Sequence, residues 1–395
     1  MNRPRIGEVA EILLDYLENN KTFQTDKIMS VPPSSYTDGG QWRAEIDLIF
    51  KRVPLMLALS CEMPKPGDYK AMEIAGLPIL IARDKAGTVR VFLNVCAHRW
   101  APVASEGYGS CPRFRFVCPF HGWTYGADGR LVGVADRAKF GDLDQSTHGL
   151  KELPCEERHG MIFGCLTAGA PLDLEGYYGA LLEEYAFSGL RDWNFLGSRV
   201  IEGANWKLTF NNFLESYHFA TLHSKTVAAG LLSNMTHYEG FGPNMRVSTS
   251  CRSLATLRDV PRDSWDEEEG RRFGFIRIFF PNVTGTLNAA PDVSLFTQTL
   301  PGPTPDKCRI VNLYCRKDPP RDESERENIE KHIDWVTADI ARDEDNAISL
   351  LIQRGLESGA HKGMLFGRNE RGNQYFHEWL NWYLQADPAL PKPVM

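Results

Sequence analysis

The sequence predicts an α+β protein in which a small all-β module precedes a larger mixed domain. Residues 77–136 consist of short strand-like runs that are separated by turn residues. Beyond Pro171, long strand-like runs over 273–316 and a strongly helical segment over 323–356 follow. We expect three parts: an N-terminal helical segment that packs on the larger domain (1–40), the β module (41–165) and the larger domain (166–395).

The bulk composition excludes several classes of protein. The 395 residues are 43% hydrophobic and 24% charged, with a net charge of -7. Such a chain has no positive field for nucleic acid or an anionic membrane surface, so we expect neither partner. We find no apolar run of about 18 residues to span a bilayer and no export signal. Nine cysteines form a poor disulfide framework in a chain of this size, which favours a cytoplasmic location.

The β module contains two predicted hairpins. The run 77–95 turns around Asp84–Gly87, and the run 122–134 turns around Ala127–Gly129. A further strand-like run, 159–166, closes or leaves the module.

Two short motifs in this module supply four side chains that can bind metal. Cys96-Ala97-His98 and Cys118-Pro119-Phe120-His121 each follow a strand-like run, as expected if two hairpin loops clamp a metal centre. The set could hold structural zinc or a two-iron, two-sulfur cluster. One cysteine and one histidine in each hairpin favour the cluster, in which both histidines bind the same iron.

The motifs resemble those of the Rieske non-haem iron oxygenases. Cys-x-His, a spacer, Cys-x-x-His-Gly-Trp and a Gly-x-Leu turn form the signature of that family. The chain departs from it at Trp100, where glycine is usual, and in a longer spacer that contains Cys111, which we interpret as a bystander thiol. The resemblance implies the alpha (catalytic) subunit of an aromatic-ring-hydroxylating dioxygenase-like enzyme. Its larger domain would have the helix-grip fold, an antiparallel sheet wrapped around a long helix.

The larger domain offers a second metal site in the run NWKLTFNNFLESYHFATLHS. Its histidines, His218 and His223, would lie roughly 140° apart on a regular α-helix and could not reach one ion. We therefore predict a local widening or break between Tyr217 and His223. Two imidazoles and one carboxylate would suit Fe(II) and leave positions open for dioxygen.

Asp345 is the candidate carboxylate. Helical periodicity places it in an apolar stripe and points its neighbours Asp343 and Glu344 away. A carboxylate in such a stripe needs a cation or strong donors. The resemblance leads to the same residue through an Asp-x7-Gln-x-Gly-Leu context, and it implies that His218, His223 and Asp345 hold the mononuclear iron.

Glu215 precedes His218 by three residues and would share its face on a helix. The resemblance implies that an acid at this place, more often Asp, bridges the cluster of one subunit and the iron of its neighbour. Glutamate makes this bridge one methylene longer. An asparagine near the iron is also implied, and both Asn211 and Asn212 remain candidates.

The resemblance implies an oxygenase cycle. NAD(P)H would act indirectly, because no GxGxxG fingerprint is present and a separate reductase or ferredoxin must deliver electrons to the [2Fe-2S] cluster. The electrons would pass on to Fe(II), where O2 is used to hydroxylate an organic, by preference aromatic, substrate. The implied assembly is a homotrimer, with or without a beta subunit.

Other functions remain open at this point. Oxidative N- or O-demethylation and quaternary ammonium monooxygenation belong to the same family, and a cation would need an aromatic cage. The candidate cage residues are Phe210, Phe213, Tyr217 and Phe219. The run 281–300 suggests strands that line an apolar cavity. Outside the family, the alternatives are a zinc-stabilised binding protein and a pure electron carrier.

Overall fold

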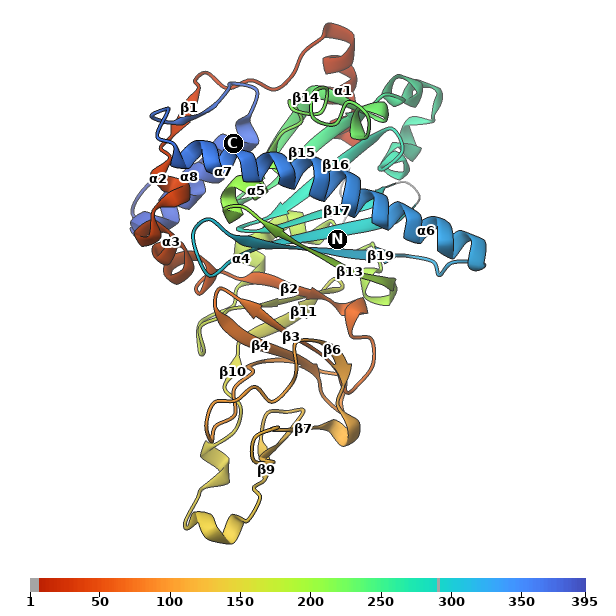
Figure 1. The fold of residues 1–395 in the computed structure, drawn as a ribbon. Coiled ribbons are helices and arrows are strands. Elements are labelled where there is room, and N and C mark those ends of the chain that lie inside the picture. The colour runs from red at the N-terminus through yellow and green to blue at the C-terminus, as the bar shows by residue number, and fades with distance from the viewer. Residues whose placement is uncertain (1–6, 290–291) are drawn as a thin grey trace. The chain divides into compact units, whose positions relative to one another are not determined.

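A computed structural model describes residues 7–289 and 292–395, which form two compact units (Figure 1). The smaller unit contains Phe50–Leu174 with Gly189–Asp192, and the larger unit contains the chain up to Ile49, Glu175–Ser188 and Trp193–Met395. The division at 40/41 and 165/166 stays a prediction. The first six residues of the predicted N-terminal segment and residues 290–291 of the predicted strand run lie outside the described residues.

The smaller unit is built from three antiparallel sheets. Their strand orders are β10-β5-β4-β3-β6, β11-β12-β2 and β7-β8-β9. The strands are β2 (Leu55–Leu59), β3 (Asp68–Ile74), β4 (Leu77–Arg83), β5 (Val89–Leu93), β6 (Gly107–Ser110), β7 (Arg115–Val117), β8 (Thr124–Gly126), β9 (Leu131–Gly133), β10 (Glu152–Leu153), β11 (Cys155–Arg158) and β12 (Met161–Gly164). Short 3-10 turns connect them: η2 (Ser60–Glu62), η3 (Pro112–Phe114), η4 (Arg137–Phe140) and η5 (Gln145–Thr147). The predicted all-β module is confirmed.

Both predicted hairpins are present. Between β4 and β5, Asp84 Oδ1 accepts hydrogen bonds from the backbone N–H groups of Ala86 and Thr88 at 2.9 and 3.0 Å, which fixes the turn. Between β8 and β9, Gly129 has a φ of +83°, and a Cβ there would lie 2.4 Å from Cε1 of Phe92. Only glycine satisfies both conditions, so this hairpin stacks closely on β5.

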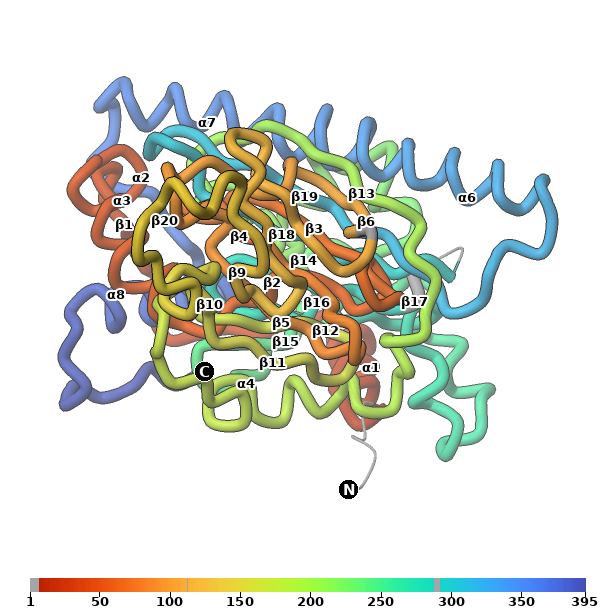
Figure 2. The backbone as a smooth tube through the Cα atoms, turned by 90° about the horizontal axis from the view of Figure 1, so that it is seen from below, coloured from red at the N-terminus to blue at the C-terminus, as the bar shows by residue number. Residues whose placement is uncertain are grey.

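The larger unit is organised around a seven-stranded antiparallel sheet of order β13-β19-β18-β17-β16-β15-β14. Its strands are β13 (Asn194–Gly203), β14 (Leu231–Phe241), β15 (Asn244–Cys251), β16 (Phe273–Phe279), β17 (Val283–Ala289), β18 (Val293–Pro301) and β19 (Cys308–Arg316). Figures 1 and 2 show a long helical span beside β13 and β19. It consists of α6 (Glu323–Trp335), the π-helix η11 (Val336–Asn346) and α7 (Ala347–Glu357). The predicted α+β class is confirmed.

Local chemistry explains where the long helical span begins and how it packs. Asp322 caps α6 by accepting a hydrogen bond from the Glu325 N–H at 2.8 Å, so the helix begins at Glu323, where the predicted helical segment 323–356 also begins. Ile329 and Ile333 then pack on Tyr314 of the sheet. The apolar face of the helix is therefore covered by the sheet.

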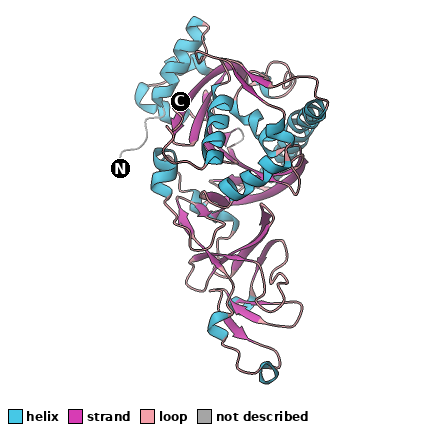
Figure 3. Ribbon diagram, turned by 90° about the vertical axis from the view of Figure 1, so that its left-hand side faces the viewer, coloured by secondary structure: helices cyan, strands magenta, loops and turns pink. Residues whose placement is uncertain are grey.

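Further helices complete the larger unit (Figure 3). They are α1 (Gly7–Asn19), α2 (Ser34–Thr37), α3 (Gly39–Glu45), the π-helix η1 (Ile46–Phe50), α4 (Leu174–Glu183), α5 (Trp206–Asn211), α8 (Arg371–Gln385) and the 3-10 segments η7 (Asn212–Leu214), η8 (Val227–Ala229), η9 (Leu254–Asp259) and η10 (Arg262–Glu268). A separate ladder pairs β1 (Met29–Val31) with β20 (Met364–Phe366). Helix α1 packs on Leu254, Leu257 and Trp265. Within the described residues, no helix is long and apolar enough to cross a bilayer.

A buried polar cluster anchors α5, the helix that leads to the second histidine motif. Lys207 Nζ lies 2.5 Å from Glu45 Oε1, and Asn211 donates to the Tyr36 hydroxyl at 3.1 Å. The same hydroxyl lies 3.1 Å from Nε2 of His377. Burial, assisted by Lys207, lowers the pKa of His377 to about 3, so this imidazole is neutral. The cluster fixes the direction in which the chain leaves α5.

Replacing His377 with glutamine should reduce the acid sensitivity of the fold. Above pH 6.5 this imidazole is neutral in the folded and the unfolded chain alike, whereas between pH 6.5 and about 3 only the unfolded chain binds the proton. In that window, His377 should therefore lower the free energy of unfolding by about 1.4 kcal/mol for each unit by which the pH falls. Urea denaturation at pH 7.5 and 5.5 gives the decrease in the free energy of unfolding between the two pH values. This decrease should be about 1.4 kcal/mol smaller in His377→Gln than in the wild type. The control is His361→Gln, because His361 is exposed. An equal decrease in the free energy of unfolding in His377→Gln and the wild type would contradict the low pKa of His377.

Candidate metal centres

The loop after β5 carries the first Cys-His pair and is shaped by Asn94. The Asn94 side chain donates to the Ala104 carbonyl at 2.8 Å and accepts from the Val103 and Ala104 N–H groups at 2.9 and 3.1 Å. The Cys96 N–H donates to the Ala101 carbonyl at 2.8 Å. Sequence reasoning missed Asn94, whose three bonds hold the loop in one conformation.

The loop after β7 carries the second pair and closes on the first. The Cys118 N–H donates to the Trp123 carbonyl at 2.8 Å, and the Gly122 N–H donates back to the Cys118 carbonyl at 3.0 Å. The Trp123 ring stacks on His98, with centroids 4.9 Å apart and planes 8° apart. The two loops therefore face each other.

The four predicted residues lie together between these loops. Cys96 and Cys118 are 1% and 3% exposed, and the rings of His98 and His121 lie on the more exposed side with centroids 4.7 Å apart. Nδ1 of His121 is buried and, among the described residues, has no hydrogen-bond partner. A ring nitrogen without a partner is expected of a metal ligand. Two buried thiols and two less buried imidazoles are a ligand set that would fit a [2Fe-2S] cluster bound by two cysteines and two histidines.

Cys111 supplies a matched test of this assignment. It is buried in the same apolar core as Cys96 and Cys118, and burial raises the pKa of its thiol. We predict that Cys111→Ala retains the absorption and paramagnetic signals of the cluster, because this thiol is a bystander. Cys118→Ser should lose both signals together with acid-labile sulfide. Loss of the cluster in Cys111→Ala would contradict the ligand set.

The second histidine motif lies in an irregular segment. Helix α5 ends at Asn211, η7 follows, and residues 216–226 form bends and turns rather than regular helix. The predicted break between Tyr217 and His223 is confirmed. Glu215 is extended, with φ -156° and ψ 170°, so placing it on a helix was wrong. Its carboxylate nevertheless turns back to the N–H of Tyr217 and the Nδ1 of His218.

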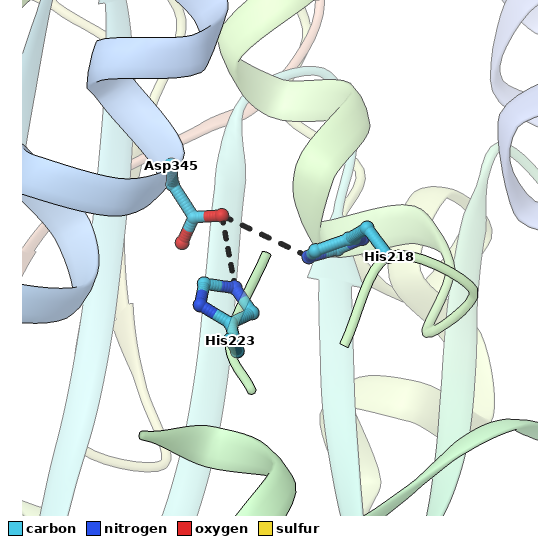
Figure 4. Close-up of side chains that lie close together, drawn as sticks. All are labelled: His218, His223 and Asp345. Carbon is cyan, nitrogen blue, oxygen red and sulfur yellow. Dashed lines mark ion pairs between the residues drawn. The ribbon is translucent and has the colours of Figure 1, made fainter. Parts of the chain in front are cut away.

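His218, His223 and Asp345 converge in the larger unit (Figure 4). Nε2 of His223 lies 3.1 Å and Nε2 of His218 lies 3.7 Å from Oδ1 of Asp345. One ligand atom from each residue falls within 4.8 Å of the others. The structure thus brings together the three residues that the sequence selected.

The helix that carries Asp345 is not the regular α-helix that was predicted. Val336–Asn346 is π-helical, so angles based on a regular α-helix do not apply. Glu344 does not point away from the site, because its Oε2 lies 2.7 Å from Nδ1 of His223 and 2.6 Å from the Thr226 hydroxyl. Asp343 does point away and pairs with Arg342. The predicted orientation of Glu344 was wrong because the wider helical turn rotates its side chain toward the histidines.

Each histidine of this site has its own glutamate. Nδ1 of His218 faces Glu215, and Nδ1 of His223 faces Glu344. A neutral imidazole that donates from Nδ1 has a lone pair on Nε2. Two such lone pairs therefore point at Asp345 Oδ1, a buried oxygen without a hydrogen-bond partner among the described residues. Three acceptors that face one another need a proton or a metal cation between them, and this ligand set suits Fe(II).

The local charge also attracts a cation. Burial alone would lower the pKa of His223, but Asp345 and Glu344 outweigh burial and raise it above the ordinary value. Without a metal, the carboxylates thus favour a proton on this ring.

The three residues line a cavity of about 640 Å³. Phe213, Phe219, Phe273 and Phe275 supply its aromatic surface. Asn212 also lines it and donates to the Asp345 carbonyl at 3.3 Å, whereas Asn211 bonds Tyr36 in the buried cluster. The open choice between the two asparagines is therefore resolved in favour of Asn212.

Some of the other residues that were predicted to line the cavity do so, and some do not. Phe210 is buried against Phe376, and Tyr217 is 61% exposed, so neither faces the cavity. In the run 281–300, Thr286 and Leu287 line it, as expected for strands that border an apolar cavity.

Glu344→Gln should weaken metal binding at this site by about 10- to 100-fold, because the Nδ1 partner of a ligand histidine sets its orientation and basicity. Titration of metal-free protein with Co(II), followed by its visible spectrum, would measure the affinity. Asp343→Asn is the matched control, since this exposed neighbour does not contact either histidine. Equal Co(II) affinities of the two variants would contradict the role of Glu344.

Two family models match the chain. The Rieske [2Fe-2S] domain matches residues 53–154, and the ring hydroxylating alpha subunit (catalytic domain) matches residues 190–386. The glycine betaine monooxygenase oxygenase subunit of Chromohalobacter salexigens is 29% identical over 72% of the chain and 63% of that protein. The large oxygenase component of the 2,4-dinitrotoluene dioxygenase system of a Burkholderia species is 34% identical over 49% of the chain and 44% of that protein. The chain thus spans less than two thirds of the length of these relatives.

A solved structure shares the fold. A quaternary ammonium Rieske monooxygenase superposes with a TM-score of 0.77 at 22% identity, over 90% of this chain and 95% of that one. The chain belongs to the Rieske oxygenases, as an alpha subunit with a Rieske domain and a catalytic domain. These two domains imply a [2Fe-2S] cluster and a mononuclear iron that works with O2.

Proposed function

We propose that the chain is the terminal oxygenase component that hydroxylates an organic, by preference aromatic, substrate by mono- or dioxygenation. The observation that carries the proposal is the convergence of His218, His223 and Asp345 on the wall of an apolar cavity of about 640 Å³. A volume of this size suits a small organic molecule. The membership in the family adds a cluster domain in the same chain.

In this proposal, His218, His223 and Asp345 would hold the mononuclear iron, which when bound supplies the reductive activation of O2. Glu215 and Glu344 keep the histidine Nδ1 protons in place, so that both Nε2 atoms are available as ligands. The phenylalanines orient an apolar substrate and exclude water from the cavity. Asn212 holds the Asp345 backbone.

Cys96, His98, Cys118 and His121 would hold the [2Fe-2S] cluster. Their place in two facing loops, with imidazoles outward, supports this assignment. We assign Glu215 as the bridge through which electrons reach the iron, since its carboxylate already binds the Nδ1 of His218. A bridge between subunits requires an oligomer, and we propose a homotrimer, with or without a beta subunit.

Electrons would come from NAD(P)H through a separate reductase or ferredoxin. We further propose a cytoplasmic location, which is supported by the absence of a disulfide among the nine cysteines, all of which lie in the described residues.

A second candidate is oxidation of a quaternary ammonium compound or an N- or O-methyl group. The similarity to the glycine betaine enzyme favours it. The zinc-protein alternative is disfavoured by the match to a [2Fe-2S] domain.

Asp345→Ala should remove the mononuclear iron and abolish turnover while the cluster stays intact, because Asp345 belongs only to the second site. Iron and acid-labile sulfide per chain, and the paramagnetic signal of the dithionite-reduced cluster, would measure the two centres separately. Asp343→Asn serves as the control. If Asp345→Ala kept full activity, Asp345 would hold no catalytic iron and the chain would act as an electron carrier. If the wild-type protein were colourless and contained stoichiometric zinc, the proposal would be refuted.

The two candidate functions are separated by a substrate screen. Oxygen consumption with aromatic acids, phenyl ethers and methylammonium compounds, followed by mass analysis of products, would identify the reaction. A ring-hydroxylated product supports the first candidate, and formaldehyde release supports demethylation. Sedimentation of a fully active monomer would contradict the trimer.

A further inference from the structure

Two exposed arginines, Arg252 and Arg271, belong to the lining of the candidate catalytic cavity. Arg252 directly follows β15, and Arg271 precedes β16, its antiparallel neighbour. The Cys251 N–H donates to the Arg272 carbonyl at 3.1 Å, and the Ser253 hydroxyl donates to the Arg271 carbonyl at 2.8 Å. The two arginines are therefore held across from each other, and both line the cavity. Like charges placed in this way repel one another.

The nearby acids do not neutralise this pair. Glu268 pairs with Arg272, and Glu269 pairs with Arg277 at 2.6 Å. Within the described part of the chain, no carboxylate forms an ion pair with Arg252 or Arg271. This exposed part of the cavity lining thus carries two positive charges that no acid of the described residues neutralises.

Arg252 is oriented before any ligand arrives. Its Nε donates to the Ala228 carbonyl at 2.8 Å, which leaves the two terminal nitrogens of the guanidinium without a protein partner among the described residues. A planar guanidinium held in this way can donate two parallel hydrogen bonds to one carboxylate. Arg271 makes no side-chain bond in the described structure and can adjust to the same anion.

Away from the candidate iron site, the cavity is lined mainly by apolar residues and offers little to bind an organic cation. Of the described residues that line it, Asp345 is the one acid, and that carboxylate belongs to the candidate iron site. All of its aromatic lining is phenylalanine, with neither tyrosine nor tryptophan. An ammonium group in this cavity would meet only phenylalanine rings, which bind cations less strongly than tryptophan, and two arginines that repel it.

We propose that the substrate of this cavity is a carboxylate with an apolar body. The carboxylate binds Arg252 and Arg271, and the body lies among the phenylalanines toward His218, His223 and Asp345. This assignment of a substrate class rests on the proposed oxygenase function. It separates two regions of one cavity, with anion recognition at the arginine pair and reaction at the iron site.

Calorimetry with matched ligands tests the proposal on the iron-loaded protein under anaerobic conditions. The probes are benzoate and 2-naphthoate, their neutral amides benzamide and 2-naphthamide, and the cation benzyltrimethylammonium. At least one carboxylate should bind about tenfold or more tightly than its amide, because charge-assisted hydrogen bonds are lost in the amide. Equal binding of each acid and its amide, tighter binding of the cation, or no binding of either acid would overturn the proposal.

Variants locate the anion site. Arg252→Gln and Arg271→Gln should each weaken carboxylate binding, Arg252→Gln by about tenfold or more because its guanidinium is already oriented. Amide binding should not change. The double variant Arg252→Glu/Arg271→Glu should reverse the preference toward benzyltrimethylammonium. Arg43→Gln, at an exposed arginine outside the cavity lining, is the matched control. Unchanged carboxylate affinity in both glutamine variants would overturn the assignment.

The two proposals can fail separately. If the protein contains iron and acid-labile sulfide but shows no preference for carboxylates, only the substrate class is refuted. If the protein lacks both iron centres, the oxygenase function fails, while the calorimetry still reports whether the arginine pair binds an anion.

Discussion

The arrangement of the second site depends on one constraint, the pairing of each histidine Nδ1 with a glutamate. Glu215 and Glu344 bind the Nδ1 atoms of His218 and His223, so the Nε2 lone pairs must face Asp345. Such a set of acceptors is stable only around a cation. The irregular segment after α5 and the π-helix η11 both serve this arrangement, because regular α-helices would turn these side chains apart.

The rest of the larger unit holds these two distorted segments in place. The polar cluster of Glu45, Tyr36 and His377 fixes α5, from which the histidine segment departs. The sheet supports the long helical span through Tyr314, Ile329 and Ile333. Because a wide helical turn and a broken helix are less favourable than regular ones, a rigid frame on both sides is needed to keep them.

The cavity combines two chemical regions. Near Asp345, three acceptors define where a metal fits, and the phenylalanines provide an apolar surface beside it. Where β15 ends and β16 begins, Arg252 and Arg271 place positive charge that no acid of the described chain pairs with. A substrate that bridges both regions would be oriented by its charged end, and its apolar part would be presented to the reacting centre.

The sequence by itself determined the α+β class, the Cys-His hairpins, the long helical segment after residue 322 and the choice of His218, His223 and Asp345. The class, the hairpins, the helical segment and the two histidines follow from residue type and spacing, which are local. Asp345 follows from the family resemblance, because the regular-helix angles that also selected it do not hold in the π-helix η11. Tertiary structure alone decided that Glu344 faces His223, that Asn212 rather than Asn211 lines the cavity, and that Arg252 and Arg271 lie across from each other. These depend on a π-helical turn and on strand register, because both are set by packing between residues far apart in the chain.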